Sequence, residues 1–130
     1  MTRKKTSGMT QEYIPGYKSL EVWKKADELA FSVYQITRGY PKDELFGLIS
    51  QMRRCVISVP ANIVEGYGRR TDKDKLQFYY IARGSLNELE YYIDISLRLK
   101  YISQESHRKI VGLREHVGRL LNGFIKSIEK

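Results

Sequence analysis

Residues 71–100 read TDKDKLQFYYIARGSLNELEYYIDISLRLK and form the longest helical pattern in the chain, so they decide its fold class. Thr71 and Asp74 resemble a capping box at the start of a helix. At roughly 1.5 Å per residue, a helix from there to Lys100 would be about 43 Å long. The apolar residues that recur along it at helical spacing are Phe78, Ala82, Leu86, Leu89, Ile93 and Leu97. This stripe predicts a face that is buried in a helical core.

A second apolar stripe follows the same segment. It consists of Ile81, Tyr92, Ile95, Leu99 and Ile102. A helix that is apolar on two sides contacts more than the helices of its own bundle. The second stripe therefore predicts an interface between copies of the chain.

Three further segments carry one apolar stripe each. Helical spacing predicts helices over residues 20–36, 43–66 and 104–128, with Ser19 as the N-cap of the first. Alternation of period two is not sustained anywhere, so no strand is expected. Short connections between four helices favour an all-α, antiparallel up-down-up-down four-helix bundle.

Pro60 lies inside the second of these helices. A proline removes one backbone hydrogen bond and clashes with the preceding turn, at a cost of about 3 kcal/mol. A kink at Pro60 is therefore expected, because the apolar stripe continues to Ile63. The alternative is two shorter helices.

The chain has 130 residues, which is the usual size of one domain. Residues 1–18 lack apolar periodicity and predict a flexible basic arm, and residues 19–130 predict the bundle. Cys55 is the only cysteine, so no intramolecular disulfide can form. There is no secretory signal and no membrane-spanning run, and a soluble cytoplasmic protein without membrane partners is expected.

The chain is basic, with 23 Lys and Arg residues against 15 Asp and Glu residues and a formal net charge of +8. In an up-down bundle the N-terminal arm, the turn near residue 70 and the C-terminus share one end. The cations that this places together are Arg3, Lys4, Lys5, Lys18, Arg69, Arg70, Lys73, Lys75 and Lys126. Such a pole would bind the phosphates of a nucleic acid, although a solvated surface that only aids solubility is the alternative.

Tyrosines accompany these cations. Tyr67 lies in the basic turn and is a candidate for stacking on unpaired bases. The pairs Tyr79-Tyr80 and Tyr91-Tyr92 are candidates for stacking on unpaired bases as well. They lie inside a long amphipathic helix, however, where packing in the core or an interface is the favoured interpretation.

No pattern of residues predicts catalysis. His107 and His116 are nine residues apart, which places them on opposite sides of one helix. The motifs of serine hydrolases, zinc proteases and phosphate-binding loops are missing. We therefore expect no enzyme activity, metal, cofactor or small-molecule substrate.

Polar residues on the facing sides of the second and third helices have a structural interpretation. Gln51, Arg54, Asn62 and Glu65 are expected to meet Ser85 or Glu88 and to fix the helix register. Gly84 and Ser85 are expected to allow close approach of the two helices.

Several short motifs resemble a known family. They are LEVWKKA at 20–26, QMRR at 51–54, Ser58, NIVEG at 62–66, ARGSL at 82–86 and Glu88-Leu89. In this order, over residues 17–128, they resemble the bacterial four-helix-bundle family of 23S ribosomal RNA intervening-sequence proteins. The resemblance implies a homopentameric ring and no known catalytic residues.

The accessory variability proteins of diversity-generating retroelements are similar in architecture, and they bind a reverse transcriptase and its template RNA. The leading hypothesis is a non-enzymatic oligomer that binds RNA or a ribonucleoprotein through the basic pole. The alternatives are an accessory subunit that binds a reverse transcriptase, and a purely structural protein–protein interaction module.

Overall fold

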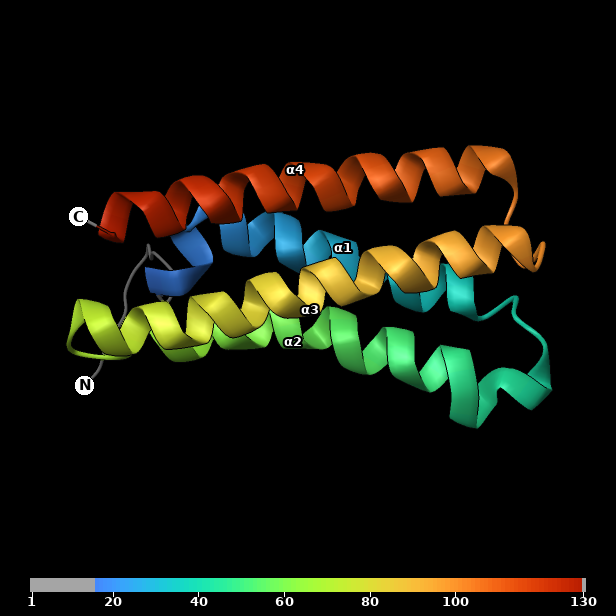
Figure 1. Cartoon of the computed structure of the whole chain (residues 1–130), viewed down its shortest axis with the longest axis horizontal. Helices are drawn as coiled ribbons and strands as arrows, with labels where there is room; N and C mark the ends of the chain where they lie inside the picture. The colour runs from blue at the N-terminus through green and yellow to red at the C-terminus, as the bar shows by residue number, and fades with distance from the viewer. Residues whose placement is uncertain (1–15, 130) are drawn as a thin grey trace, which may run out of the picture.

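The computed structural model describes residues 16–129, and every regular element in that range is helical (Figure 1). The four α-helices are α1 (Glu21–Thr37), α2 (Ser50–Tyr67), α3 (Asp72–Arg98) and α4 (Gln104–Ile128). A short 3-10 turn, η1 (Gly16–Ser19), precedes α1. A second 3-10 turn, η2 (Lys42–Glu44), and a π-helical turn, η3 (Leu45–Ile49), connect α1 to α2. The helices pack in the cyclic order α1, α2, α3, α4, with α2 and α3 in the most extensive contact. The predicted all-α class and four helices are confirmed.

The starts of the helices agree with the sequence at α3 and differ at α1. Thr71 caps α3, because its hydroxyl oxygen accepts a hydrogen bond of 3.1 Å from the Asp74 backbone N–H. The prediction of Ser19 as the N-cap of α1 was wrong. Leu20 occupies that position without a side-chain cap, while the Ser19 hydroxyl donates to the Gly16 carbonyl within η1.

The segment before α2 is less regular than the expected helix from residue 43. Gly47 adopts φ −111° and ψ −109°, which is not helical, and the regular α-helix begins only at Ser50. Glu44 stabilises this segment, since its carboxylate accepts from the Leu48 backbone N–H at 3.1 Å and from the Tyr101 hydroxyl at 2.8 Å.

Pro60 is buried in the middle of α2. The helix is continuous from Ser50 to Tyr67, so the alternative of two shorter helices does not apply. The break in helical geometry lies upstream at Gly47, and the kink at Pro60 stays a prediction.

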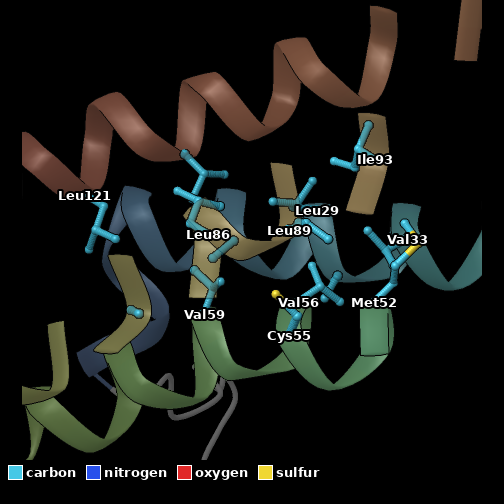
Figure 2. Close-up of a cluster of buried hydrophobic side chains, with 14 of the residues drawn as sticks. Leu29, Val33, Met52, Cys55, Val56, Val59, Leu86, Leu89, Ile93 and Leu121 are labelled. Carbon is cyan, nitrogen blue, oxygen red and sulfur yellow. The ribbon is translucent and has the colours of Figure 1, made fainter. Parts of the chain in front are cut away.

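The core is formed by the predicted stripes of all four helices. Figure 2 shows Leu29 and Val33 of α1, several side chains of α2 and α3, and Leu121 of α4 meeting between the helices. On α3, the fully buried members of the first stripe are Ala82, Leu86, Leu89 and Ile93. Two residues of the second stripe, Ile81 and Leu99, stay 51% and 48% exposed in the single chain. The second stripe is therefore only partly covered by the chain's own helices, since Tyr92 and Ile102 pack against the core.

Close approach of α2 and α3 does not depend on Gly84, which was a wrong expectation. Nothing outside its own helix lies within 4 Å of a Cβ placed on Gly84, so this residue faces outward. The tight glycine is Gly66, where a Cβ would lie 2.5 Å from Cε1 of Tyr79. Ser85 does lie at the contact, as its hydroxyl donates to the Ser58 hydroxyl over 2.8 Å.

No helix between residues 16 and 129 combines the length and the apolar character that crossing a membrane requires.

Candidate nucleic-acid interface

The predicted pole forms where three segments meet. Figure 1 shows η1, the α2–α3 turn and the last turn of α4 at the same end of the bundle. We call this end the basic pole and define it by Lys18, Tyr67, Arg69, Arg70, Lys73, Lys75 and Lys126. The predicted site residues Arg3, Lys4 and Lys5 lie outside the described residues. The convergence of the other cations agrees with the expected topology, and their role in binding stays a prediction.

Two cations of the basic pole are held by neighbouring groups. Arg69 Nη2 lies 2.7 Å from a carboxylate oxygen of Glu65, and its guanidinium carbon lies 4.6 Å from the centre of the Phe78 ring. Lys75 Nζ donates to the Tyr67 carbonyl at 3.0 Å and lies 5.6 Å from the centre of the Tyr67 ring. These two side chains stabilise the turn, and a phosphate would have to compete with their present partners.

The other four cations of the pole, Lys18, Arg70, Lys73 and Lys126, are exposed. Carboxylates of Asp72, Asp74 and Glu129 lie in the same segments, which weakens the positive potential there. Cations also gather at the opposite end of the bundle, among them Arg38, Lys42, Arg98, Lys100, Arg108 and Lys109. Net charge is therefore shared between the two ends of the bundle. An aromatic ring also lies beside a cation at the opposite end, where the Arg53 guanidinium carbon is 4.6 Å from the centre of the Tyr34 ring.

Tyr67 is 41% exposed and packs against the backbone of η1. A Cβ on Gly16 would lie 2.5 Å from its hydroxyl oxygen, so this contact requires the glycine. Gly16 therefore covers the hydroxyl end of the Tyr67 ring, and the rest of the ring remains partly exposed to solvent.

The other tyrosines divide into two groups. Tyr79 is 1% exposed, and burial raises its pKa to about 12. Tyr92 is half-buried and donates to Glu88. These two agree with the expected packing role, whereas Tyr80 and Tyr91 are 40% and 57% exposed. The exposure of Tyr80 and Tyr91 could be predicted from the first α3 stripe, because its helical phase places residues 80 and 91 on the outer side of the helix.

The α2–α3 contact contains the predicted polar pairs in part. Arg54 Nη2 lies 2.7 Å from a Glu88 carboxylate oxygen, and Gln51 accepts from the same guanidinium. A hydrogen bond from the Tyr92 hydroxyl, followed by that of Arg54, lowers the pKa of Glu88 below its ordinary value. Asn62 instead donates within its own helix to Ser58. Glu65 also differs from the expectation, since it pairs with Arg69 and not with α3.

The potential metal-binding and nucleophilic side chains are dispersed. Among residues 16–129, no three His, Cys, Asp or Glu side chains come together as a metal site would require. His107 Nε2 lies 3.1 Å from a carboxylate oxygen of Asp94 on α3. The Cys55 thiol is buried, and desolvation raises its pKa to about 12, so it is a poor nucleophile.

Two comparisons with known proteins agree with this fold. The 23S rRNA-intervening sequence protein family matches residues 18–123 of the chain. The structure is also similar to the crystal structure of a protein of unknown function from the S23 ribosomal protein family of Bacteroides thetaiotaomicron. The TM-score is 0.75 with 26% sequence identity, over 81% of this chain and 95% of that one. No curated protein matches the chain. Nothing in these similarities supports a reverse transcriptase as a partner.

Proposed function

Since the chain belongs to the 23S rRNA-intervening sequence protein family, we propose that it is a non-enzymatic, oligomeric protein that binds RNA, alone or in a ribonucleoprotein. The observation that carries the proposal is the meeting of η1, the α2–α3 turn and the end of α4 at one pole. Cations that are far apart in sequence lie together there. Phosphate contacts of this kind supply affinity without reading sequence, which suits a protein that recognises RNA by backbone and shape.

Self-association is the second part of the proposal. Ile81 and Leu99 on α3 are uncovered, and an apolar groove of about 330 Å³ between α1 and α2 is lined by Phe31, Tyr34 and Ile57 among others. Exposed apolar surface on two sides of a small bundle is typical of a protein that buries it against further copies. The family resemblance implies five subunits in a ring, which would repeat the basic pole and make RNA binding multivalent. A monomer in light scattering at micromolar concentration would contradict this part.

The RNA-binding proposal is tested with Arg70 and Lys73, two exposed cations whose side chains form no hydrogen bond or ion pair with other residues of the described range 16–129. We expect Arg70→Glu combined with Lys73→Glu to weaken RNA binding at least tenfold at low salt and to leave the helical circular dichroism unchanged. Lys42→Glu combined with Lys100→Glu is the matched control, since it makes the same charge change at the opposite end of the bundle.

Equal losses in the two double variants would show that only net charge matters, and the basic pole would no longer be the site. If the wild-type oligomer has no affinity for RNA even at low salt, the protein is a purely structural module. A cytoplasmic location is part of the same proposal, because ribosomal RNA and its assemblies are found there.

A further inference from the structure

A surface outside the basic pole carries exposed aromatic rings. Tyr80 and Tyr91 lie on the outer side of α3, 11 residues apart, which is about three turns or 16 Å along the helix. Both rings are exposed, Tyr91 more than Tyr80, so packing in the core does not explain them. A tyrosine that is not needed by the core and lies on the surface is available to a ligand.

The helix α4 lies beside α3 (Figure 1). Polar and cationic residues lie on the outer sides of both helices at the level of these rings. We call this surface the α3–α4 outer face. It consists of Tyr80, Arg83, Asn87, Tyr91, Arg119, Asn122 and Lys126. Arg83 joins the two helices, because its Nη1 donates to Oδ1 of Asn122 over 3.2 Å.

Two neighbouring groups contact the Tyr80 side chain. Its hydroxyl donates a hydrogen bond to Glu129 near the end of α4. The guanidinium carbon of Arg83 lies 5.1 Å from the centre of the ring. A tyrosine ring beside an arginine offers two flat surfaces, and nucleic-acid bases stack on both kinds.

The helix backbone on this face is accessible as well. Gly84 of α3 and Gly123 of α4 are exposed, and a Cβ on either would meet nothing within 4 Å. Glycine destabilises a helix interior, and no packing contact within the described chain requires it at these two positions. The missing side chains leave room for a ligand to approach the backbone closely.

Carboxylates limit the electrostatic attraction of this face. Glu90 lies 3.6 Å from Arg114, Glu129 accepts from Tyr80, and Glu115 is exposed. A duplex is recognised mainly through its phosphates and would gain little here. Unpaired bases gain more, since they present the ring faces and edges that tyrosines and asparagine amides contact.

We propose that the α3–α4 outer face binds the unpaired bases of single-stranded nucleic acid, with Tyr80 and Tyr91 as stacking platforms. The inference rests on the proposed function, because Lys126 belongs to both surfaces and a strand bound at the basic pole would continue along α3 and α4. It names the class of nucleic acid that the protein prefers: single strands, loops or ends over duplex.

The test compares a fluorescently labelled 12-nucleotide oligouridine, the corresponding oligothymidine and a 12-base-pair RNA duplex in anisotropy titrations. We expect the single strands to bind more tightly than the duplex. Stacking is worth about 1–3 kcal/mol per base, so Tyr80→Leu combined with Tyr91→Leu should weaken single-strand binding at least tenfold and duplex binding less than twofold. Phe46→Leu is the control, because it removes an exposed aromatic ring from the opposite end of the bundle.

The outcomes separate this inference from the proposed function. Unchanged single-strand binding by the double tyrosine variant, or tighter binding of the duplex by the wild type, overturns the inference and leaves the basic pole in place. Loss of all binding in the wild type overturns both. Unchanged circular dichroism and oligomeric state show that the variants are folded, and single substitutions at Tyr80 and Tyr91 then locate the effect.

Discussion

Two glycines of the same bundle should respond in opposite ways to replacement by alanine. A Cβ on Gly66 would lie 2.5 Å from Cε1 of Tyr79 and 3.1 Å from the backbone oxygen of Lys75. The Tyr79 ring is fully buried and lies 5.0 Å from the Phe124 ring, so it has little room to move. A Cβ on Gly112 in α4 would meet nothing within 4 Å outside its own helix.

The magnitudes follow from these distances. Overpacking costs about 1–3 kcal/mol. Replacing a helical glycine by alanine gains at most about 1 kcal/mol, and less near a helix end such as that of α2. Gly66→Ala should therefore lower the free energy of unfolding by about 1–2 kcal/mol, whereas Gly112→Ala should raise it by about 0.5–1 kcal/mol.

Urea denaturation followed by circular dichroism at 222 nm measures both variants. Because self-association makes apparent stability depend on protein concentration, wild type and variants are compared at one concentration. Equal stability of the two variants would refute the assignment of Gly66 as the close contact between α2 and the start of α3. Destabilisation by Gly112→Ala would show instead that a second copy packs closely against α4.

Three further predictions concern single groups. Cys55, whose pKa burial raises to about 12, should react with thiol reagents at pH 8 only as fast as the protein opens, and mild urea should accelerate the reaction. The pKa of Glu44 is lowered, first by its hydrogen bond from the Leu48 backbone N–H, so its stabilisation is present above pH 4.5 and is lost as the pH falls. Glu44→Gln should therefore reduce stability at pH 7 more than at pH 3 in urea titrations. The Tyr40 hydroxyl is buried and forms no hydrogen bond of good geometry within residues 16–129, although the neighbouring Ser96 hydroxyl partly offsets the rise in its pKa that burial causes. Tyr40→Phe should then leave the thermal midpoint unchanged or raise it, and a fall of several degrees would reveal a missed hydrogen bond.

The sequence was sufficient for those features of the fold that depend on local pattern. The residue type and spacing of Thr71 are enough to predict a cap, and the period of the first α3 stripe is enough to predict a buried face. Residue type alone does not show that Leu20 and not Ser19 is the N-cap of α1, because the N-cap is defined by backbone conformation and η1 uses the serine within its own turn. The irregular backbone at Gly47 depends on how Glu44 contacts both Leu48 and Tyr101, and Tyr101 is distant in sequence.

Gly84 and Gly66 show a different limit of prediction from sequence, which concerns contacts between helices. Both are glycines inside predicted helices, and residue type alone does not say which one meets a neighbour. The phase of the α3 stripe places residue 84 on the outer side of the helix, so the sequence itself excludes Gly84 from the contact with α2. The contact of Gly66 with Tyr79 could not be predicted, because it depends on the geometry of the turn between α2 and α3.

In the candidate site too, the general arrangement could be predicted from the sequence, whereas individual side-chain contacts could not. Topology predicted that η1, the turn and the end of α4 would meet, because alternate connections of an up-down bundle share an end. The pairs Arg69–Glu65 and Lys75–Tyr67 were not predicted, and they determine which cations are available to a ligand.

This availability leads to a last prediction, which concerns salt. The basic pole offers four exposed cations to phosphates, Lys18, Arg70, Lys73 and Lys126. Arg69 and Lys75 are not counted, because they already contact Glu65 and Tyr67. For single strands, each neutralised phosphate contributes about −0.7 to the slope of log K against log salt concentration, so the pole should contribute about −3.

Slope and affinity at fixed salt distinguish the two surfaces. Arg70→Glu with Lys73→Glu removes two of these contacts and should make the slope shallower by about 1.4. Tyr80→Leu with Tyr91→Leu should reduce the affinity at every salt concentration and leave the slope unchanged, because stacking releases no counterions. If the tyrosine variant changes the slope as strongly as the charge variant does, the outer face acts through phosphates and the division between the two surfaces is wrong.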